Sequence, residues 1–239
     1  MPIVTIHQPN FLPNAAFFAK LMSADYFVYL DTAQFPTEGW VHRNKLLDRM
    51  EATWVTAPVI TRARGVQRID QVELTRDHKW KKKLLRRIEQ EYSRAAFRDE
   101  IVGLMGEILL RPWEKLADLS IALCEWMLGA LSISVPRERA SELDRAGKTD
   151  PAAAAVGATE RLVNLVKLYG GTTYTSGPSG KKYLDEALFA QAGIELRYFT
   201  FSAPPYPGKE GKMLGGLALL DMLLWLGPKQ TRALLDGAL

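Results

Sequence analysis

A chain of 239 residues with 47% hydrophobic content can bury a substantial core, and one domain spanning residues 1–239 is the default expectation. The net charge of +4 is modest for this length, and much of the excess lies in the segment 79–87, which argues against a dedicated nucleic-acid protein. Cys124 is the single cysteine, so no internal disulfide can form, and a reducing cytoplasm fits best. The longest apolar segment, 214–226, is too short to cross a bilayer and contains Asp221, so we expect no membrane insertion.

Two short apolar runs near the amino terminus predict buried strands of a largely parallel sheet. Residues 3–6 and 26–30 are β-branched or aromatic and are bounded by turn formers. A helix over 14–23 would join them as parallel neighbours. The runs 54–59 and 71–74 predict a third strand and a short further strand.

Helical spacing of apolar residues predicts a helical segment over about 77–132. The first helix begins after Asp77, which is suited to cap it, and two more are expected over 97–110 and 113–131. The basic side chains of 79–87 fit the solvated face of the first helix better than a nucleic-acid or membrane site.

Alternation of strands and helices resumes in the last third of the chain. Strands are predicted near 133–135, 172–175 and 196–201, and helices from Thr159 to Gly170 and over 214–226, the latter ended by Gly227-Pro228. The alanine-rich segment 142–158 is open to either a loop or a helix, and Lys209, Glu210 and Lys212 are candidates for a lid. The predicted fold class is α/β, a mostly parallel sheet with flanking helices and an inserted helical segment.

Polar side chains gather just past the first two predicted strands, where parallel sheets bind ligands. They are His7, Gln8, Asn10, Asp31, Gln34, Arg43 and Asn44. An imidazole can act as base or acid near neutral pH, and a guanidinium can clamp a phosphate or carboxylate, although Arg43 could instead form a surface ion pair. Asp31 could orient His7, hold a metal through water or cap a helix; no spacing here requires a metal, and no cofactor is identified.

A second polar group lies at the predicted junction after strand 172–175. The turn Ser176-Gly177-Pro178-Ser179-Gly180 combines two hydroxyls with backbone amides, and Tyr183 follows it closely. This geometry suits phosphate or carboxylate oxygens. No hydrolase elbow surrounds the serines, so binding is the better role for them than nucleophilic attack.

These motifs resemble the WbqC-like family along essentially the whole chain. The matching segments are His-Gln-Pro-Asn-Phe-Leu-Pro at 7–13, Phe17-Phe18 with Lys20, Gln34-Phe35, Trp40 with Arg43-Asn44-Lys45, Thr159-Glu160-Arg161-Leu162, Tyr174 to Gly177 with Gly180, Tyr183-Leu184-Asp185, and Leu219-Leu220-Asp221 with Gly227-Pro228. Asn14-Ala15-Ala16 departs from the tryptophan-containing helix start that is usual in the family. The resemblance implies bacterial surface-polysaccharide biosynthesis and a glycine or aminoacyl-type transferase that decorates an amino sugar.

The first hypothesis is therefore an enzyme that forms an amide on the amine of an amino sugar or a nucleotide-linked metabolite. His7 would take the proton, Asp31 would orient it, and the other polar residues would hold an anionic small-molecule substrate and an activated acyl donor. Two alternatives stay open: a noncatalytic sugar-nucleotide-binding module, and an ATP-dependent enzyme of nucleotidyl transfer or ligation. A tRNA or nucleic-acid binder that uses 79–87 is a third, weaker class.

Overall fold

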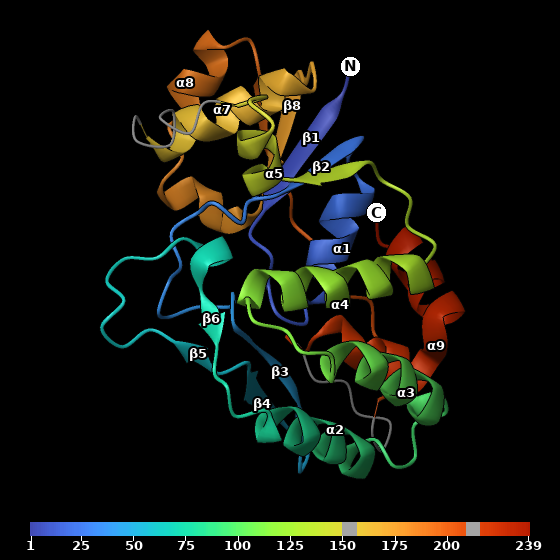
Figure 1. Cartoon of the computed structure of the whole chain (residues 1–239). Coiled ribbons are helices and arrows are strands. Elements are labelled where there is room, and N and C mark those ends of the chain that lie inside the picture. The colour runs from blue at the N-terminus through green and yellow to red at the C-terminus, as the bar shows by residue number, and fades with distance from the viewer. Residues whose placement is uncertain (150–156, 209–215) are drawn as a thin grey trace. The chain divides into compact units, whose positions relative to one another are not determined.

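The computed structural model describes residues 1–149, 157–208 and 216–239 (Figure 1). These residues form two compact units. The first unit comprises Met1–Gln8, Ala19–Thr32 and Ser134–Ser202, and the second comprises Pro9–Phe18, Ala33–Ile133 and Ala203–Leu239. The lid candidates Lys209, Glu210 and Lys212, and residues 150–156 of the alanine-rich segment, lie outside the described residues.

The first unit contains a five-stranded sheet in which every pairing is parallel (Figure 1). Its strands are β1 (Ile3–His7), β2 (Tyr26–Tyr29), β7 (Arg137–Arg139), β8 (Thr173–Ser176) and β9 (Glu195–Tyr198), in the spatial order β7-β2-β1-β8-β9. Counted along the chain within this unit, the order is 3-2-1-4-5. The chain thus starts in the middle of the sheet and builds outward in both directions. The predicted α/β class with a parallel sheet is confirmed.

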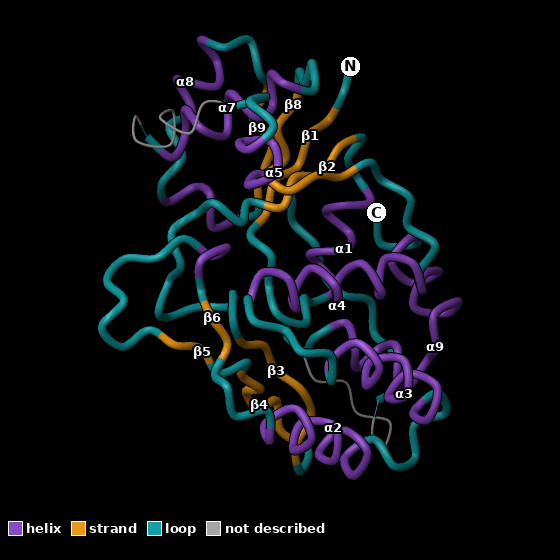
Figure 2. Tube along the Cα trace, in the orientation of Figure 1, coloured by secondary structure: helices purple, strands orange, loops and turns teal. Residues whose placement is uncertain are grey.

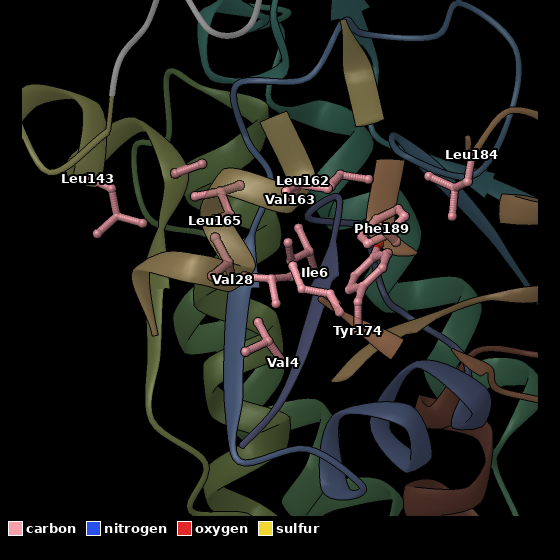
Figure 3. Close-up of a cluster of buried hydrophobic side chains, with 13 residues drawn as sticks. Val4, Ile6, Val28, Leu143, Leu162, Val163, Leu165, Tyr174, Leu184 and Phe189 are labelled. Carbon is pink, nitrogen blue, oxygen red and sulfur yellow. The ribbon is translucent and has the colours of Figure 1, made fainter. Parts of the chain in front are cut away.

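Helices flank this sheet, and the apolar core lies between them and the central strands. The helices are α5 (Ala140–Arg145), α7 (Ala158–Leu168), α8 (Glu186–Gln191), the 3₁₀ helix η2 (Pro178–Lys182) and the second half of α1 (Ala15–Met22). Figure 3 shows Val4 and Ile6 of β1 with Leu162 and Leu165 of α7 in this core. Thr5, between the two β1 residues, is also buried, as expected of a parallel strand covered on both faces.

The second unit is built from helices and two small antiparallel sheets (Figure 2). Its strands are β3 (Arg43–Asp48) paired with β4 (Glu51–Thr56), and β5 (Val59–Ile60) paired with β6 (Glu73–Leu74); its helices are the 3₁₀ helix η1 (Ile69–Gln71), α2 (Lys79–Glu91), α3 (Arg98–Leu109), α4 (Leu116–Ala130) and α9 (Leu219–Asp236). The three helices α2, α3 and α4 confirm the helical segment predicted over 77–132. Cys124 is buried in α4.

The strand predicted over 54–59 is divided in the structure, since 54–56 belong to β4 and Val59 begins β5, and both strands pair antiparallel outside the five-stranded sheet. The partner of β4, β3, has no strong sequence pattern, since it combines three charged residues with one amide. The two-residue loop Arg49-Met50 has φ values of 49° and 68°. Positive φ at both positions is typical of a tight hairpin turn, whose usual sequence is Asn-Gly. Arg49-Met50 does not have that sequence, so the turn could not be recognised from the sequence.

The third strand of the parallel sheet is also displaced from its prediction. The sequence favoured 133–135, whereas β7 spans Arg137–Arg139 and pairs with β2. An edge strand is paired on one side only and its side chains remain partly exposed, so β7 does not need the apolar residues that identify buried strands.

The predicted end of the apolar helix at Gly227-Pro228 is confirmed as a break in the helical backbone, and a second helical stretch follows it within the same element. α9 runs on to Asp236, with a kink at Gly227, whose φ is 71°. A Cβ at Gly227 would lie 2.6 Å from the ring of Phe97, so glycine is required there by both the backbone and the packing. Pro228 then begins a second helical stretch, a position that suits proline.

Candidate functional site

The carboxyl ends of β2, β1 and β8 lie side by side at one edge of the parallel sheet. His7 ends β1 and is paired with Tyr29 of β2, while Ser176 ends β8. The strand order reverses between β1 and β8, and in open parallel sheets ligands bind at such a reversal, beyond the carboxyl ends. The topology therefore brings His7, Gln8 and the turn after Ser176 to the expected ligand position within the first unit.

The imidazole of His7 is held in one tautomer by its own loop. Nδ1 lies 2.9 Å from the backbone oxygen of Gln8. Burial, followed by the positive charge of Lys20, lowers the pKa of His7 to about 3, so the ring is neutral near pH 7. Because a carbonyl oxygen can only accept, Nδ1 carries the hydrogen and Nε2 carries the lone pair.

Lys20 is a candidate functional residue that the site prediction missed. It lies on α1 with 3% of its surface exposed, and its Nζ donates to the backbone oxygen of Ile6 over 3.3 Å. Burial lowers the pKa of Lys20 to about 7, and its charge is close enough to His7 to depress the histidine pKa. A single lysine in the otherwise apolar helix sequence AAFFAKLM was the available signal.

Asp31 is fully buried just after β2, and its known partners come from the β7–α5 junction. Its carboxylate accepts from Nε of Arg139 at 2.9 Å, from the backbone N–H of Ser141 at 2.9 Å and from the Ser141 hydroxyl at 2.6 Å. Ser141 lies in the first turn of α5, where backbone N–H groups have no partner within the helix. Asp31 therefore caps this helix although it is distant from it in sequence. The geometry favours the capping role among the three considered for Asp31.

The turn after β8 is compact and depends on glycine. A Cβ at Gly180 would overlap the hydroxyl of Ser176 and lie 2.8 Å from Leu184, so glycine allows this close approach. Ser176 is buried and donates to the backbone oxygen of Gly177 over 3.2 Å, whereas Ser179 and Tyr183 are exposed. Extending the β1–β8 register by two residues places Gly177 beside His7.

The remaining predicted site residues belong to the second unit, whereas His7 and Asp31 belong to the first. They are Asn10 in irregular backbone after β1, Gln34 in an isolated backbone bridge with Arg68, and Arg43 and Asn44 on β3. Arg43 was expected in a loop at a strand end, but it lies within the hairpin.

Asn44 has a structural explanation. It is buried, its Nδ2 donates to the backbone oxygen of Leu12 at 2.5 Å, and its Oδ1 accepts from the backbone N–H of Lys45. Leu12 has a positive φ of 50°, a conformation that a non-glycine residue adopts only when its surroundings hold it. Both ends of the Asn44 amide are thus engaged by backbone, and we do not assign it to a substrate.

Among the described residues, no group of three or more histidine, cysteine, aspartate or glutamate side chains is placed to hold a metal ion. Within the same residues, no helix is long and apolar enough to cross a membrane.

The strand order and the polar strand ends define an α/β protein with a candidate ligand site at the carboxyl edge of a parallel sheet. The chain belongs to the WbqC-like protein family, whose model matches residues 8–233. It is 29% identical over 235 residues to "Uncharacterized protein Rv1507c" of Mycobacterium tuberculosis (strain ATCC 25618 / H37Rv), and the match covers 95% of each chain. No solved structure matches the chain significantly.

Proposed function

We infer that this protein is an enzyme of polysaccharide-related biosynthesis that forms an amide bond. It would move an acyl or aminoacyl group, such as a glycyl group, onto the amine of an amino sugar or a nucleotide-linked metabolite in the cytoplasm. Membership of the WbqC-like family supports the biosynthetic role. The observation that carries the chemistry is the buried Lys20, with a pKa of about 7, next to a neutral His7 at the end of β1.

An amino sugar is largely protonated at neutral pH and must lose a proton before or during attack. A base works best when its pKa lies near the working pH, and Lys20 meets this condition better than His7. Lys20 therefore accepts the proton in place of His7, and Nε2 of His7 accepts a hydrogen bond from the attacking amine and orients it.

The bonds in this step balance without a metal or a redox partner. The acceptor nitrogen attacks the acyl carbon, the new C–N bond forms, and the bond from carbon to the oxygen or sulfur of the donor carrier breaks. The acceptor enters the step as the neutral amine, after its ammonium form has released one proton to water; Lys20 takes the second amine proton during attack and then returns it to the leaving oxygen or sulfur. Neutral groups held in place before the reaction spare the cost of rearranging solvent.

The turn after β8 would hold an anionic group of one substrate. Ser176, Gly177 and Ser179 offer hydroxyl and amide donors at the strand-order reversal, with Tyr183 at the exposed rim. Asp31 supports this edge by tying β2 to Arg139 and Ser141. Gln8, Asn10 and Gln34 remain predicted substrate contacts.

The strand order also supports a second candidate, an ATP-dependent enzyme that transfers a nucleotidyl group. Sheets with the order 3-2-1-4-5 commonly bind nucleotides at the reversal, here between β1 and β8. In that reaction the buried Lys20 would remain protonated and would neutralise phosphate charge. A noncatalytic sugar-nucleotide-binding module would use the same position without turnover.

The test is to incubate the purified chain with a bacterial metabolite extract supplemented with ATP, and to search by mass spectrometry for products that gain an acyl or aminoacyl mass. We expect such a product with the wild type and at least a hundredfold less of it with Lys20→Met or His7→Asn. The control is Lys167→Met, which alters an exposed lysine of α7 and should change the amount of product less than twofold. Release of pyrophosphate with nucleotidyl products would favour the second candidate. Ligand stabilisation without any product would favour the binding module.

A further inference from the structure

The β3–β4 hairpin of the second unit has one buried face and one exposed face. Asn44, Leu46 and Val55 are buried, whereas Arg43, Lys45, Trp54 and Thr56 are partly or fully exposed; toward the turn this alternation ends, because Leu47 is also buried. In the hairpin register Arg43 lies opposite Thr56, and Lys45 lies opposite Trp54, so these four side chains share the exposed face. Figures 1 and 2 show the two strands side by side. We call this surface, together with Trp40, the hairpin face.

Two large aromatic rings lie together on the hairpin face. The ring centroids of Trp40 and Trp54 are 4.7 Å apart, and their exposed fractions are 42% and 38%. Large aromatic side chains cover much apolar area, and leaving two of them exposed next to each other is unfavourable unless a ligand or partner covers them.

Two cations are held on the same aromatic group. The guanidinium carbon of Arg43 is 4.6 Å from the centroid of Trp54, and Nζ of Lys45 is 5.1 Å from it. Arg43 and Lys45 are two positions apart on one strand face, roughly 7 Å along the strand. Their charges repel each other, and within residues 1–149, 157–208 and 216–239 neither has a carboxylate partner.

The guanidinium of Arg43 is oriented for an external anion. Its Nε donates to the backbone oxygen of Gly39 at 2.8 Å, which fixes the plane of the group. The two terminal nitrogens have no hydrogen-bond partner in the described part of the chain, and such a fork matches two oxygens of a phosphate. A second cation nearby suits a second phosphate.

We propose that the hairpin face binds the nucleoside diphosphate portion of an activated sugar. Arg43 and Lys45 contact the diphosphate, and the exposed ring of Trp40 stacks against the base. This proposal rests on the proposed function in one respect: it identifies the nucleotide-linked class among the substrates considered for the enzyme.

The site is tested by calorimetric titration of the full chain with uridine diphosphate at low and moderate salt. Arg43→Gln/Lys45→Gln should weaken binding at least tenfold and reduce its salt dependence, because two phosphate contacts are lost. The matched control, Lys82→Gln/Lys83→Gln, removes two exposed charges from α2 of the same unit and should change binding less than twofold. Equal weakening by both double variants, or no binding of uridine diphosphate by the wild type at millimolar concentration, overturns the proposal.

The aromatic part is tested separately. Trp40→Leu should lower the affinity for uridine diphosphate at least fivefold and change the affinity for inorganic pyrophosphate less than twofold. Circular dichroism checks that the variant is folded. Trp40 is 42% exposed and precedes β3, so its replacement leaves the buried residues of the hairpin unchanged. Equal affinity of the wild type for pyrophosphate and uridine diphosphate contradicts base stacking. If the wild type bound a single-stranded oligonucleotide much more tightly than uridine diphosphate, the hairpin face would be a nucleic-acid site, and this result would also overturn the proposal.

The two proposals fail in different ways. Lys20→Met should abolish turnover and leave uridine diphosphate binding within twofold. A protein that forms no amide but binds uridine diphosphate through Arg43 and Lys45 would refute the proposed function and keep the hairpin site. A protein that forms the amide while Arg43→Gln/Lys45→Gln retains full nucleotide affinity would refute the hairpin site only.

Discussion

The side-chain nitrogen of Lys20 donates to the backbone oxygen of Ile6, one residue before the strand-end His7. This contact holds the amine of α1 against the strand that delivers the imidazole. Burial lowers the pKa of both groups, and the charge on Lys20 further disfavours a charge on His7. Near neutral pH the pair therefore carries at most one positive charge, which lies on Lys20.

Lys20→Met should make the protein more stable and inactive. The folded-state pKa of Lys20 is about 7, below its ordinary value of 10.5. The unfolded chain therefore binds more protons between these values, and stability rises with pH across that window. Below pH 7 the folded wild type keeps a buried charge, which the methionine variant lacks. The free energy of unfolding of the variant, measured in urea at pH 6, should therefore be higher by about 1–4 kcal/mol, reduced by the loss of the hydrogen bond to Ile6. A less stable variant at pH 6 would contradict the buried charge.

Product formation should rise as pH increases through about 7, because Lys20 is a base only after it loses its proton. The pH profile of kcat/KM measures this value. Lys20→Arg keeps the charge at all accessible pH values and should be inactive throughout. An unchanged profile in Lys20→Arg would exclude Lys20 as the base.

His7 should remain neutral down to about pH 4, as measured by the NMR shifts of its ring. Its folded-state pKa is about 3 and its ordinary value is 6.5, so the unfolded chain binds more protons between these values and stability falls as pH drops from 6.5 to 3. In Lys20→Met the pKa of His7 should rise, because one of its two depressing causes is removed. A His7 that titrates near 6.5 in the wild type would contradict its burial.

Asp31→Asn should destabilise the first unit by about 2–5 kcal/mol, because the amide sets a donor against either the Ser141 N–H or Nε of Arg139 and removes the negative charge that both groups contact. Urea unfolding gives the comparison. The control is Glu195→Gln, which breaks the exposed pair with Arg197 in the same sheet and should cost less than about 1 kcal/mol. Similar losses in the two variants would show that Asp31 is not a structural anchor.

Gly180→Ala should cost about 1–3 kcal/mol, because its Cβ would overlap the hydroxyl of Ser176 and lie 2.8 Å from Leu184. Gly177→Ala in the same turn is the matched control, since nothing lies within 4 Å of its added Cβ and its φ is −71°. We expect a change below about 0.5 kcal/mol for that control. Equal effects would mean that the close approach of Gly180 to Ser176 is unimportant.

The sequence by itself determined the elements that have strong local patterns. The β-branched run of β1, the aromatic run of β2 and the helical stripes of α2, α3 and α4 are recognisable because burial imposes a fixed spacing on apolar residues. It also identified His7 and the turn after β8 as polar groups at strand ends.

Only the tertiary structure decided the strand order, the hairpin and the environment of each polar group. β3 and β7 are polar and gain their structure from pairing with distant segments, so their own sequences carry little signal. The capping contacts of Asp31 come from residues more than 100 positions away, and the pKa of Lys20 depends on burial that no local pattern specifies. Protonation and hydrogen-bond partners are set by neighbours in space, and those neighbours exist only once the chain has folded.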